Sequence, residues 1–452
     1  MDESTLVGHF SPHASLAALG TLLCEKDIFG PIAEQVKISQ KSVKHKPVEK
    51  VHDAFIAMLA GAHGLVEINT VLRCDEGLQQ AFGRPRCAEQ SVVQQTLSAA
   101  TPDNVGQMRR AYQQIYREHG FARRHNYQTG CLVLDADVTG NPCGKKAEFA
   151  SKGYFANERN RRGRQIGRVL ATPYQEIVAE QLFDGKKQLS QTLLDLLSDA
   201  DETLELDEAK RAETIIRVDS GGGSLDDVNE ILRRGYQFHG KEYSTPKAQR
   251  LAESVERWFP DPRVPGREVG WVTEPANEYV RPVRRIAVRC RKNNGQWGIG
   301  VLISTAPPEE VFAKTRLPFT YASKEQLLAY VYFYDARGGG CETSFKGDKQ
   351  GLAMTHRNKK SFTGQQMLQY LTALAHNVLM WAKQWLLPEV PALKKYGILR
   401  MVRDVLQISG RIDQTEQKIS GIVLNQKAPL AKQIADAFDK LLKPAHVDIT
   451  LG

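Results

Sequence analysis

The sequence predicts an α/β fold in which an all-helical N-terminal domain precedes a core of alternating strands and helices. Apolar residues follow helical spacing through roughly the first 125 residues, and at Gly130 the spacing changes to that of an extended chain. A second apolar run, at 214–219, ends in an acid, a glycine turn and a helix start, which is typical of α/β proteins. With 452 residues, 41% of them hydrophobic, the chain can bury a large core in about two to four domains.

The chain is basic, and its charge favours an acidic partner. The formal net charge of +9 predicts nucleic acid before an anionic membrane. Seven cysteines are scattered without the spacing of a zinc site or a disulfide framework, which predicts reduced thiols in the cytoplasm. The apolar stretch at 367–387 is interrupted by polar residues such as Gln369 and Lys383, so we expect a buried helix there and no membrane partner.

Four helices are predicted in the N-terminal domain, at 47–61, 76–82, 88–97 and 101–120. The second and third are short and are joined by a turn that contains Gly83. This pair fits a DNA-reading helix-turn-helix, and an ordinary helical hairpin is the alternative.

An apolar run at 131–139 has the length of a strand and carries two acids near its end. Because side chains alternate along a strand, Asp135, Asp137 and Thr139 share one face. Asp137 is the predicted functional acid, since Thr139 places a hydroxyl beside it that could orient a ligand or a water. Asp135 remains an alternative, as does a plain turn-forming role for both acids.

The most basic segment of the chain follows this strand. Its cations are Lys145, Lys146, Lys152, Arg159, Arg161, Arg162, Arg164 and Arg168. Only Glu148 and Glu158 oppose them, and Tyr154 and Phe155 stand among them, as stacking on bases or sugars requires. We expect these cations to bind DNA phosphates in a salt-dependent manner. A solvated β-hairpin is the alternative.

The run at 214–219 predicts a parallel strand that ends in Asp219, at the edge where open α/β sheets place their sites. The glycines at 221–223 allow a close approach of backbone or substrate. Ser224 and Asp227 resemble a capping box for a helix that ends at Gly235. The glycine run lacks the Gly-Lys-Ser/Thr ending of a nucleotide P-loop, which argues against that function.

A third acid, Glu342, lies in the stretch Tyr-Asp-Ala-Arg-Gly-Gly-Gly-Cys-Glu that begins at Tyr334. Glu342 comes 342 − 219 = 123 positions after Asp219, too far for a single βα unit, so a β-rich insertion is predicted there. If the chain is helical from Cys341, Glu342 and Lys349 are two turns apart on one face. A solvated ion pair between them is the alternative.

These motifs carry a resemblance. Asp-x-Thr, Asp-Ser-Gly, and Tyr-x-x-Arg followed by Glu and Lys resemble the motifs of DDE transposases of bacterial insertion sequences. Among these, the chain is most similar to the branch with a β insertion before the Glu, the insertion-sequence 4 and 1380 type, whose signature is Tyr-Arg-Glu-Lys. The resemblance implies an RNase H-like catalytic core. Its acidic triad would be Asp137, Asp219 and Glu342, and its supporting residues Tyr334, Arg337 and Lys349.

One spacing departs from that family. Four residues, from Gly338 to Cys341, separate Arg337 from Glu342, where the family usually has three. The extra residue falls in a glycine run, where a loop can absorb it, but it leaves the place of Arg337 open. The six residues between Glu342 and Lys349 agree with the family's spacing.

The resemblance also implies an activity, cofactors and partners. The three carboxylates would hold two Mg²⁺ ions, for which Mn²⁺ can substitute, about 3.5 to 4 Å apart. The enzyme would free the 3′ ends of its mobile element and join them to target DNA, acting as a homodimer on double-stranded DNA at the nucleoid of the bacterial cytoplasm. The alternatives are a metal-dependent DNA nuclease or resolvase without strand transfer, and a non-catalytic DNA-binding descendant of a transposase.

Together these observations predict four segments. They are a helical DNA-binding and dimerisation domain at 1–125, the first part of the catalytic core at 126–240, the β-rich insertion at 241–318, and the second part of the core with the C-terminal region at 319–452. The last segment is predicted to contain a long helix ended by Pro388, a strand at 419–424 and a terminal helix from Leu430.

Overall fold

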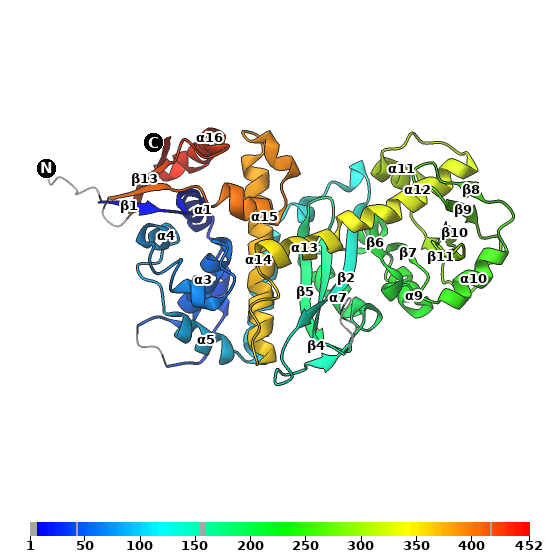
Figure 1. Cartoon of the computed structure of the whole chain (residues 1–452), viewed down its shortest axis with the longest axis horizontal. Coiled ribbons are helices and arrows are strands. Elements are labelled where there is room, and N and C mark those ends of the chain that lie inside the picture. Colours follow the sequence, from blue (N-terminus) through cyan, green and yellow to red (C-terminus); the bar gives the residue numbers. More distant parts are fainter. Residues whose placement is uncertain (1–6, 42–43, 154, 156–159, 416–417) are drawn as a thin grey trace. The chain divides into compact units, whose positions relative to one another are not determined.

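The computed structural model of the chain describes residues 7–41, 44–153, 155, 160–415 and 418–452. The chain forms two compact units, and most of their helices and strands are labelled in Figure 1. Unit 1 consists of Met1–Gly120, Asn141–Ser151 and Ser344–Gly452, and unit 2 of Phe121–Gly140 and Lys152–Thr343. The last crossing between the units falls inside a helix, α13 (Cys341–Gly351).

Five strands form the centre of unit 2: β2 (Leu132–Pro142), β4 (Arg162–Ala171), β5 (Glu176–Asp184), β6 (Thr214–Val218) and β7 (Gln237–Lys241). They lie in the order β5-β4-β2-β6-β7. β4 and β5 form an antiparallel hairpin, whereas β6 runs parallel to both β2 and β7. Counted along the chain, these strands take the order 3-2-1-4-5. This is the strand order of an RNase H-like core, so the predicted fold class is confirmed.

Helices cover this sheet. α7 (Leu193–Leu204) packs on β4 and β5, and α9 (Leu225–Arg233) packs on β7, while α8 (Glu208–Ala212) leads into β6. The Ser224 side chain caps α9 by accepting a hydrogen bond from the Asp227 backbone N–H, as its sequence pattern predicts. A 3₁₀ turn at Leu189–Gln191 precedes α7.

The β-rich insertion extends the same sheet. It contains α10 (Thr245–Glu253), β8 (Phe259–Pro260), β9 (Arg267–Trp271), β10 (Arg284–Arg291), β11 (Trp297–Ser304) and α11 (Pro308–Thr315). β11 pairs antiparallel with β7, and β10, β9 and β8 follow in that order. The insertion is therefore built onto the edge of the core sheet.

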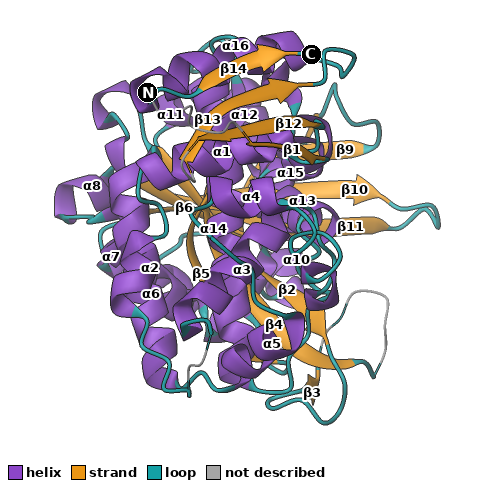
Figure 2. Cartoon of the chain, turned by 90° about the vertical axis from the view of Figure 1, so that its left-hand side faces the viewer, coloured by secondary structure: helices purple, strands orange, loops and turns teal. Residues whose placement is uncertain are grey.

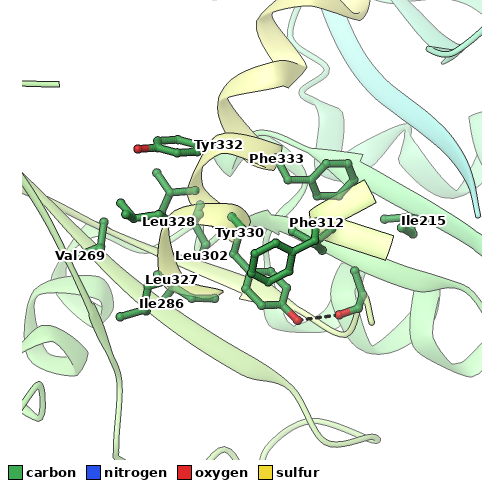
Figure 3. Packing of buried hydrophobic residues seen from close by; sticks show 14 of the residues in the cluster. Ile215, Val269, Ile286, Leu302, Phe312, Leu327, Leu328, Tyr330, Tyr332 and Phe333 are labelled. Carbon is green, nitrogen blue, oxygen red and sulfur yellow. Dashed lines mark hydrogen bonds between the residues drawn. The ribbon is translucent and has the colours of Figure 1, made fainter. Parts of the chain in front are cut away.

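A cluster of buried apolar side chains holds α12 (Ser323–Asp335) on this sheet (Figure 3). Leu327 and Phe333 of the helix pack with residues of the strands such as Ile215 and Leu302. Tyr330 is also buried, and its hydroxyl donates a hydrogen bond to the Ala306 carbonyl at 2.8 Å. Each fully buried side chain of this kind stabilises the fold by about 1.5–3 kcal/mol. The cluster fixes the C-terminal end of α12. Tyr334, a predicted site residue, lies at this end, and the predicted Arg337 follows in the next turn.

Unit 1 is mainly helical. Its helices are α1 (Ala14–Glu25), α2 (Gly30–Gln35), α3 (Pro47–Leu59), α4 (Glu76–Ala81), α5 (Gln90–Ser98), α6 (Pro102–His119), α14 (Phe362–Leu386), α15 (Ile398–Arg400) and α16 (Ala431–Leu442). α14 is buried along most of its length, and α3, α5 and α6 pack around it. Among the described residues, no helix is both long enough and apolar enough to cross a membrane.

The boundaries of the helical unit differ from the predicted ones. Residues 344–452 join the N-terminal helices in unit 1, whereas the prediction placed them with the second part of the core, because the apolar surface of α14 is covered by α3, α5 and α6. The two short helices α4 and α5 pack mainly on other helices: α4 on α1, and α5 on α3 and α14. The two helices are therefore held in place by different neighbouring helices of unit 1.

Unit 1 also contains a small sheet, in which the predicted strand at 419–424 is confirmed as β13 (Lys418–Leu424), whereas the helical prediction for the N-terminus missed the strand β1 (Val7–Ser11). The strands of this sheet lie in the order β1, β12 (Gly410–Thr415), β13 and β14 (Asp448–Leu451). Figure 2 shows these strands beside α1 and α16, which pack on β13 and β14. β1 is a strand because it pairs antiparallel with β12, roughly 400 residues away in the chain.

Candidate active site

Two neighbouring parallel strands bring Asp137 and Asp219 together. Their register places Asp135 of β2 opposite Arg217 of β6. Asp137 lies two residues further along β2, and Asp219 directly follows the end of β6 with an extended backbone, so continued alternation puts both side chains on the face that carries Asp135 and Arg217. Adjacent strands are about 4.8 Å apart, so the two carboxylates are neighbours. The Asp219 carboxylate accepts a hydrogen bond from the Gly221 N–H at 2.8 Å, which fixes its direction at the start of a 3₁₀ turn.

Asp135, the alternative to Asp137, is fully occupied inside the protein. Its side chain is completely buried, and the Arg217 guanidinium donates to its two oxygens at 2.6 and 2.9 Å. The Thr172 hydroxyl donates a third hydrogen bond at 2.7 Å. Asp137 is only partly buried, so it is the carboxylate of β2 that faces the candidate site.

Asp137 is held at an elevated pKa. Burial is the largest cause, the nearby charge of Asp219 also raises the pKa, and the Arg337 cation opposes both, so that the pKa of Asp137 lies at about 6. The Arg337 guanidinium donates to the Asp137 carboxylate at 3.2 Å, and the Val138 N–H donates at 2.8 Å. Two close carboxylates that share one cation are a typical environment for a functional acid.

Tyr334 and Arg337 complete this group. Burial lowers the pKa of Arg337, but the charges of Asp137 and Asp219 outweigh burial and raise the pKa above its usual value. The pKa of Tyr334 is raised as well, first by burial, and the two aspartates add to the effect. The tyrosine therefore remains a protonated hydroxyl at neutral pH. Four of the six residues predicted by the resemblance meet in one place.

The glycine run before Glu342 has a definite packing role. A Cβ added to Gly340 would lie 1.8 Å from a carboxylate oxygen of Asp135, so no side chain fits there. The neighbouring Cys341 thiol donates to the Asp135 carbonyl at 3.0 Å. Gly338 and Gly339, in contrast, have open space around them. The run thus lets α13 begin directly against β2, and the extra residue leaves Arg337 in contact with Asp137.

Glu342 is not gathered with the two aspartates. Its side chain is exposed at the start of α13. In the described part of the chain, no three His, Cys, Asp or Glu side chains lie close enough together to hold a metal ion. The Glu342 backbone is nevertheless near β2, since its Cα is about 3.8 Å from that of Cys341. Lys349 stands in the last turn of α13 and belongs to unit 1.

The pair of aspartates fits a hard divalent cation. Their carboxylate oxygens are the donor type that Mg²⁺ prefers, and Mg²⁺ is usually bound by one or two carboxylates together with water and substrate phosphate. Burial, and after it the charge of Asp219, raises the pKa of Asp137 and so disfavours its ionised form. A cation between the two side chains would offset this effect.

The predicted DNA-binding cations fall into two groups. Lys145 and Lys146 in unit 1, and Lys152, Arg161 and Arg162 in unit 2, are exposed. Arg164 and Arg168 are fully buried in β4, and Arg168 donates to the Glu180 carboxylate at 2.7 Å. The prediction for these two is wrong, because a side chain inside the sheet cannot reach a DNA strand.

The other predictions for this basic segment concern its remaining arginine, its two aromatic residues and the alternative of a solvated β-hairpin. Arg159 and Tyr154 lie outside the described residues. Phe155 is buried, which leaves it unavailable for stacking on a base. The segment does enter a β-hairpin, of β4 and β5, but β4 is buried rather than solvated. Arg164 stands opposite Asp184 and Arg168 opposite Glu180 on β5, and this even spacing of arginines against acids is the sequence signal for a paired face.

A hollow in unit 2 that shares Tyr334 with the candidate site was not anticipated from the sequence. It has a volume of about 380 Å³ and is lined by Tyr334, Trp297 and the cations Lys241, Arg267 and Lys292. Next to it, the Arg289 guanidinium lies between the rings of Trp258 and Trp297, at 4.1 and 4.6 Å from their centroids. Aromatic faces and cations together suit the bases and phosphates of a nucleic-acid strand.

Comparisons with known proteins give little beyond this. No family model matches the chain, and no curated protein matches it. Among solved structures, it is similar to a piggyBac transposase in a cryo-EM synaptic complex with hairpin DNA. That similarity has a TM-score of 0.45 at 10% sequence identity, over 97% of this chain and 82% of the other. It is too low to support an argument about function, which depends on the site itself.

Proposed function

We propose that the protein is a DDE-type DNA transposase of the bacterial insertion-sequence kind, which cleaves the ends of its element and joins the 3′ ends to target DNA. The observation that supports this is that Asp137 of β2 and Asp219, which directly follows the adjacent parallel strand β6, meet Tyr334 and Arg337 from the end of α12 and the turn after it, in an RNase H-like core. In this proposal a homodimer acts on double-stranded DNA.

Asp137 and Asp219 would hold the divalent ions, with Glu342 as the third ligand. When bound, two Mg²⁺ ions, or Mn²⁺ in their place, neutralise charge at the attacking and leaving oxygens of a phosphodiester. Glu342 is exposed and follows Cys341, which contacts β2, so in the proposal a change at the start of α13 in the DNA-bound state brings its carboxylate to the aspartates.

Arg337 and Tyr334 would position the scissile phosphate. Arg337 uses one Nη to hold Asp137, and a guanidinium has five N–H donors, which leaves donors for phosphate oxygens. Tyr334 keeps its proton at neutral pH and can donate to a phosphate or stack on a sugar. Lys349, on the same helix as Glu342, would bind the DNA backbone.

One observation favours a competing function. The exposure of Glu342 fits a non-catalytic DNA-binding descendant, in which the third acid has no partners to meet. A metal-dependent nuclease without strand transfer is the other competitor, because cleavage and joining use the same acids.

The test is a cleavage and joining assay with the full-length protein, Mg²⁺ and a plasmid that carries the DNA flanking the gene. The variants are Asp137→Asn and Asp219→Asn, with Asp195→Asn as a matched control, since Asp195 is an exposed aspartate of α7 in the same unit. We expect cleavage and joining of pre-cut 3′ ends by the wild type and the control, and a loss of both of at least about a hundredfold in the two variants. Cleavage that survives Asp219→Asn contradicts the proposal. Cleavage without joining identifies the nuclease instead.

A further inference from the structure

Unit 1 contains a hollow that is lined by positively charged side chains. Its lining residues are distant in the sequence from those of the candidate active site. Its volume is about 330 Å³, and it is lined by residues from 40–50 and 73–95. Its cations are Lys41, Lys44, Lys50, Arg73 and Arg86. Glu89 is the acid in the lining, so five cations and one carboxylate leave a formal excess of 5 − 1 = 4 positive charges. Such an excess inside a concave surface attracts anions.

None of these five cations forms an ion pair with any residue that the structure describes. The Lys50 ammonium donates to the Gln40 side-chain carbonyl at 3.3 Å, and Arg73 donates to Asn69 at 3.4 Å. Both partners are neutral. Lys50 is only 6% exposed. A buried ammonium without an acid is costly, and an anion in the hollow would remove that cost.

The acids closest to Lys50 in the sequence interact with another cation, Arg84. Asp53 and Glu49 stand on the same helix as Lys50, but Arg84 donates to Asp53 at 2.8 Å and pairs with Glu49 at 3.3 Å. His45, which also lines the hollow, has its pKa lowered by burial first and then by the Arg84 cation, so it is neutral at pH 7. Asp53 and Glu49 are therefore engaged elsewhere, and the lysine stays without a carboxylate.

A second hollow adjoins the first. It has a volume of about 500 Å³ and shares Arg73, Arg86 and Cys87 with the first hollow, so the two meet at these residues. Gln414 lines it, is only 8% exposed, and has an amide Nε2 without a hydrogen-bond partner. Buried amide donors are almost always satisfied, so this one, in a hollow lined by Arg73, Arg86 and the acid Glu76, is suited to donate to an acceptor group of a ligand.

We propose that these two hollows form a site for phosphate groups, in which Lys50, Arg73 and Arg86 bind phosphate oxygens and Gln414 donates a further hydrogen bond. Arginine and lysine are the side chains that bind phosphate in proteins, through charge-assisted hydrogen bonds. The phosphate belongs either to the backbone of duplex DNA or to a small phosphate compound. With DNA as the source, the site deepens the proposed function and rests on it.

The test measures binding of inorganic pyrophosphate, and separately of a short duplex DNA of arbitrary sequence, to the full-length protein without divalent ions. The variants are Lys50→Met and Arg86→Gln. Lys427→Gln is the matched control, because Lys427 is an exposed lysine of unit 1 outside both hollows. We expect pyrophosphate to bind the wild type and the control, and to bind each variant at least about tenfold more weakly.

The two ligands separate the two sources. If duplex DNA is also weakened at least about tenfold by both variants, the phosphate is that of DNA. If pyrophosphate binding falls and DNA binding does not, the site takes a small phosphate compound. Pyrophosphate that fails to bind the wild type, or that binds both variants as well as the control, overturns the proposal.

Two further measurements separate phosphate binding from a structural role and from catalysis. Lys50→Met removes a buried charge whose partner is neutral, so its thermal midpoint should match or exceed that of the wild type, and a marked drop shows a structural role instead. Asp137→Asn should leave pyrophosphate binding unchanged while it abolishes DNA cleavage. Failure of the phosphate site and failure of the proposed function are thereby distinguished.

Discussion

Arg217 and Asp135 form a buried ion pair that ties the centre of the sheet to the helix above it. The guanidinium donates to the carboxylate at 2.6 and 2.9 Å across β6 and β2. It also donates to the Phe333 carbonyl at 2.6 Å, and lies 4.9 Å from the centre of the Phe333 ring. Tyr334 directly follows Phe333 in α12. By binding the Phe333 carbonyl, Arg217 therefore helps to fix the position of Tyr334 relative to Asp137 and Asp219.

Arg217→Met should therefore be strongly destabilising. It leaves Asp135 buried without its cation, which costs about 3–5 kcal/mol of unfolding free energy. Urea unfolding of the purified variant measures the loss. The double variant Arg217→Met with Asp135→Leu is the control, because it removes both charges, and we expect it to recover most of the loss. Equal instability of the single and double variants would show that the ion pair itself is not the cause.

Gly340→Ala should also destabilise the protein, through a different cause. The added methyl group would meet the Asp135 carboxylate at 1.8 Å, inside the ion pair. We expect a loss of about 1–3 kcal/mol in urea unfolding, typical of overpacking in a close-packed interior. Gly338→Ala is the matched control, since no atom lies within 4 Å of its added Cβ. An equal effect of the two substitutions would contradict the packing role assigned to Gly340.

The sequence identified the strands of the site and favoured Asp137 as its acid, but it could not exclude Asp135. The runs at 131–139 and 214–219 are apolar and of strand length, so β2 and β6 followed directly from them. Alternation could not separate Asp135 from Asp137, because both lie on one face. What distinguishes the two acids is the ion pair between Asp135 and Arg217. Arg217 is 82 residues away in the sequence, and no local pattern reveals which acid it binds.

Three other features of the structure also could not be predicted from local sequence patterns. β1 is five residues long and is a strand only through its pairing with β12, which no local pattern reports. Arg164 and Arg168 looked like surface cations by composition, but their pairing face is decided by β5. The distance of Glu342 from the aspartates depends on how α13 starts, which the contact between Gly340 and Asp135 sets.

Asp137→Asn should stabilise the protein at neutral pH and not at low pH. The folded-state pKa is raised from 3.8 to about 6, so the folded protein resists ionisation of this carboxyl. The cost is absent below about pH 4, grows between pH 4 and 6, and is complete above pH 6. An amide has no charge to lose, so we expect a gain of up to about 3 kcal/mol at pH 7.5 and almost none at pH 4.

Thermal unfolding across this pH range measures the effect, with the exposed Asp195→Asn as control. A gain of equal size at both pH values would mean that the charge of Asp137 is not the cause.

Divalent ions should bind in a pH-dependent way that Asp137 controls. A cation binds the ionised carboxylate, and with a pKa of about 6 only about a tenth of Asp137 is ionised at pH 5, against nearly all of it at pH 7.5. The affinity for Mn²⁺ or Mg²⁺ should therefore fall about tenfold between pH 7.5 and 5. At pH 7.5 an excess of the ion should raise the thermal midpoint, because it binds the folded state.

Asp137→Asn and Asp219→Asn should each abolish this rise, since each removes one of the two adjacent carboxylates. Glu342→Gln gives the sharpest reading of the third position. Because Glu342 is exposed in the DNA-free protein, its substitution should leave the ion affinity of the free protein unchanged and weaken it only when a DNA end is present. Equal weakening with and without DNA would show that Glu342 already joins the aspartates in the free protein.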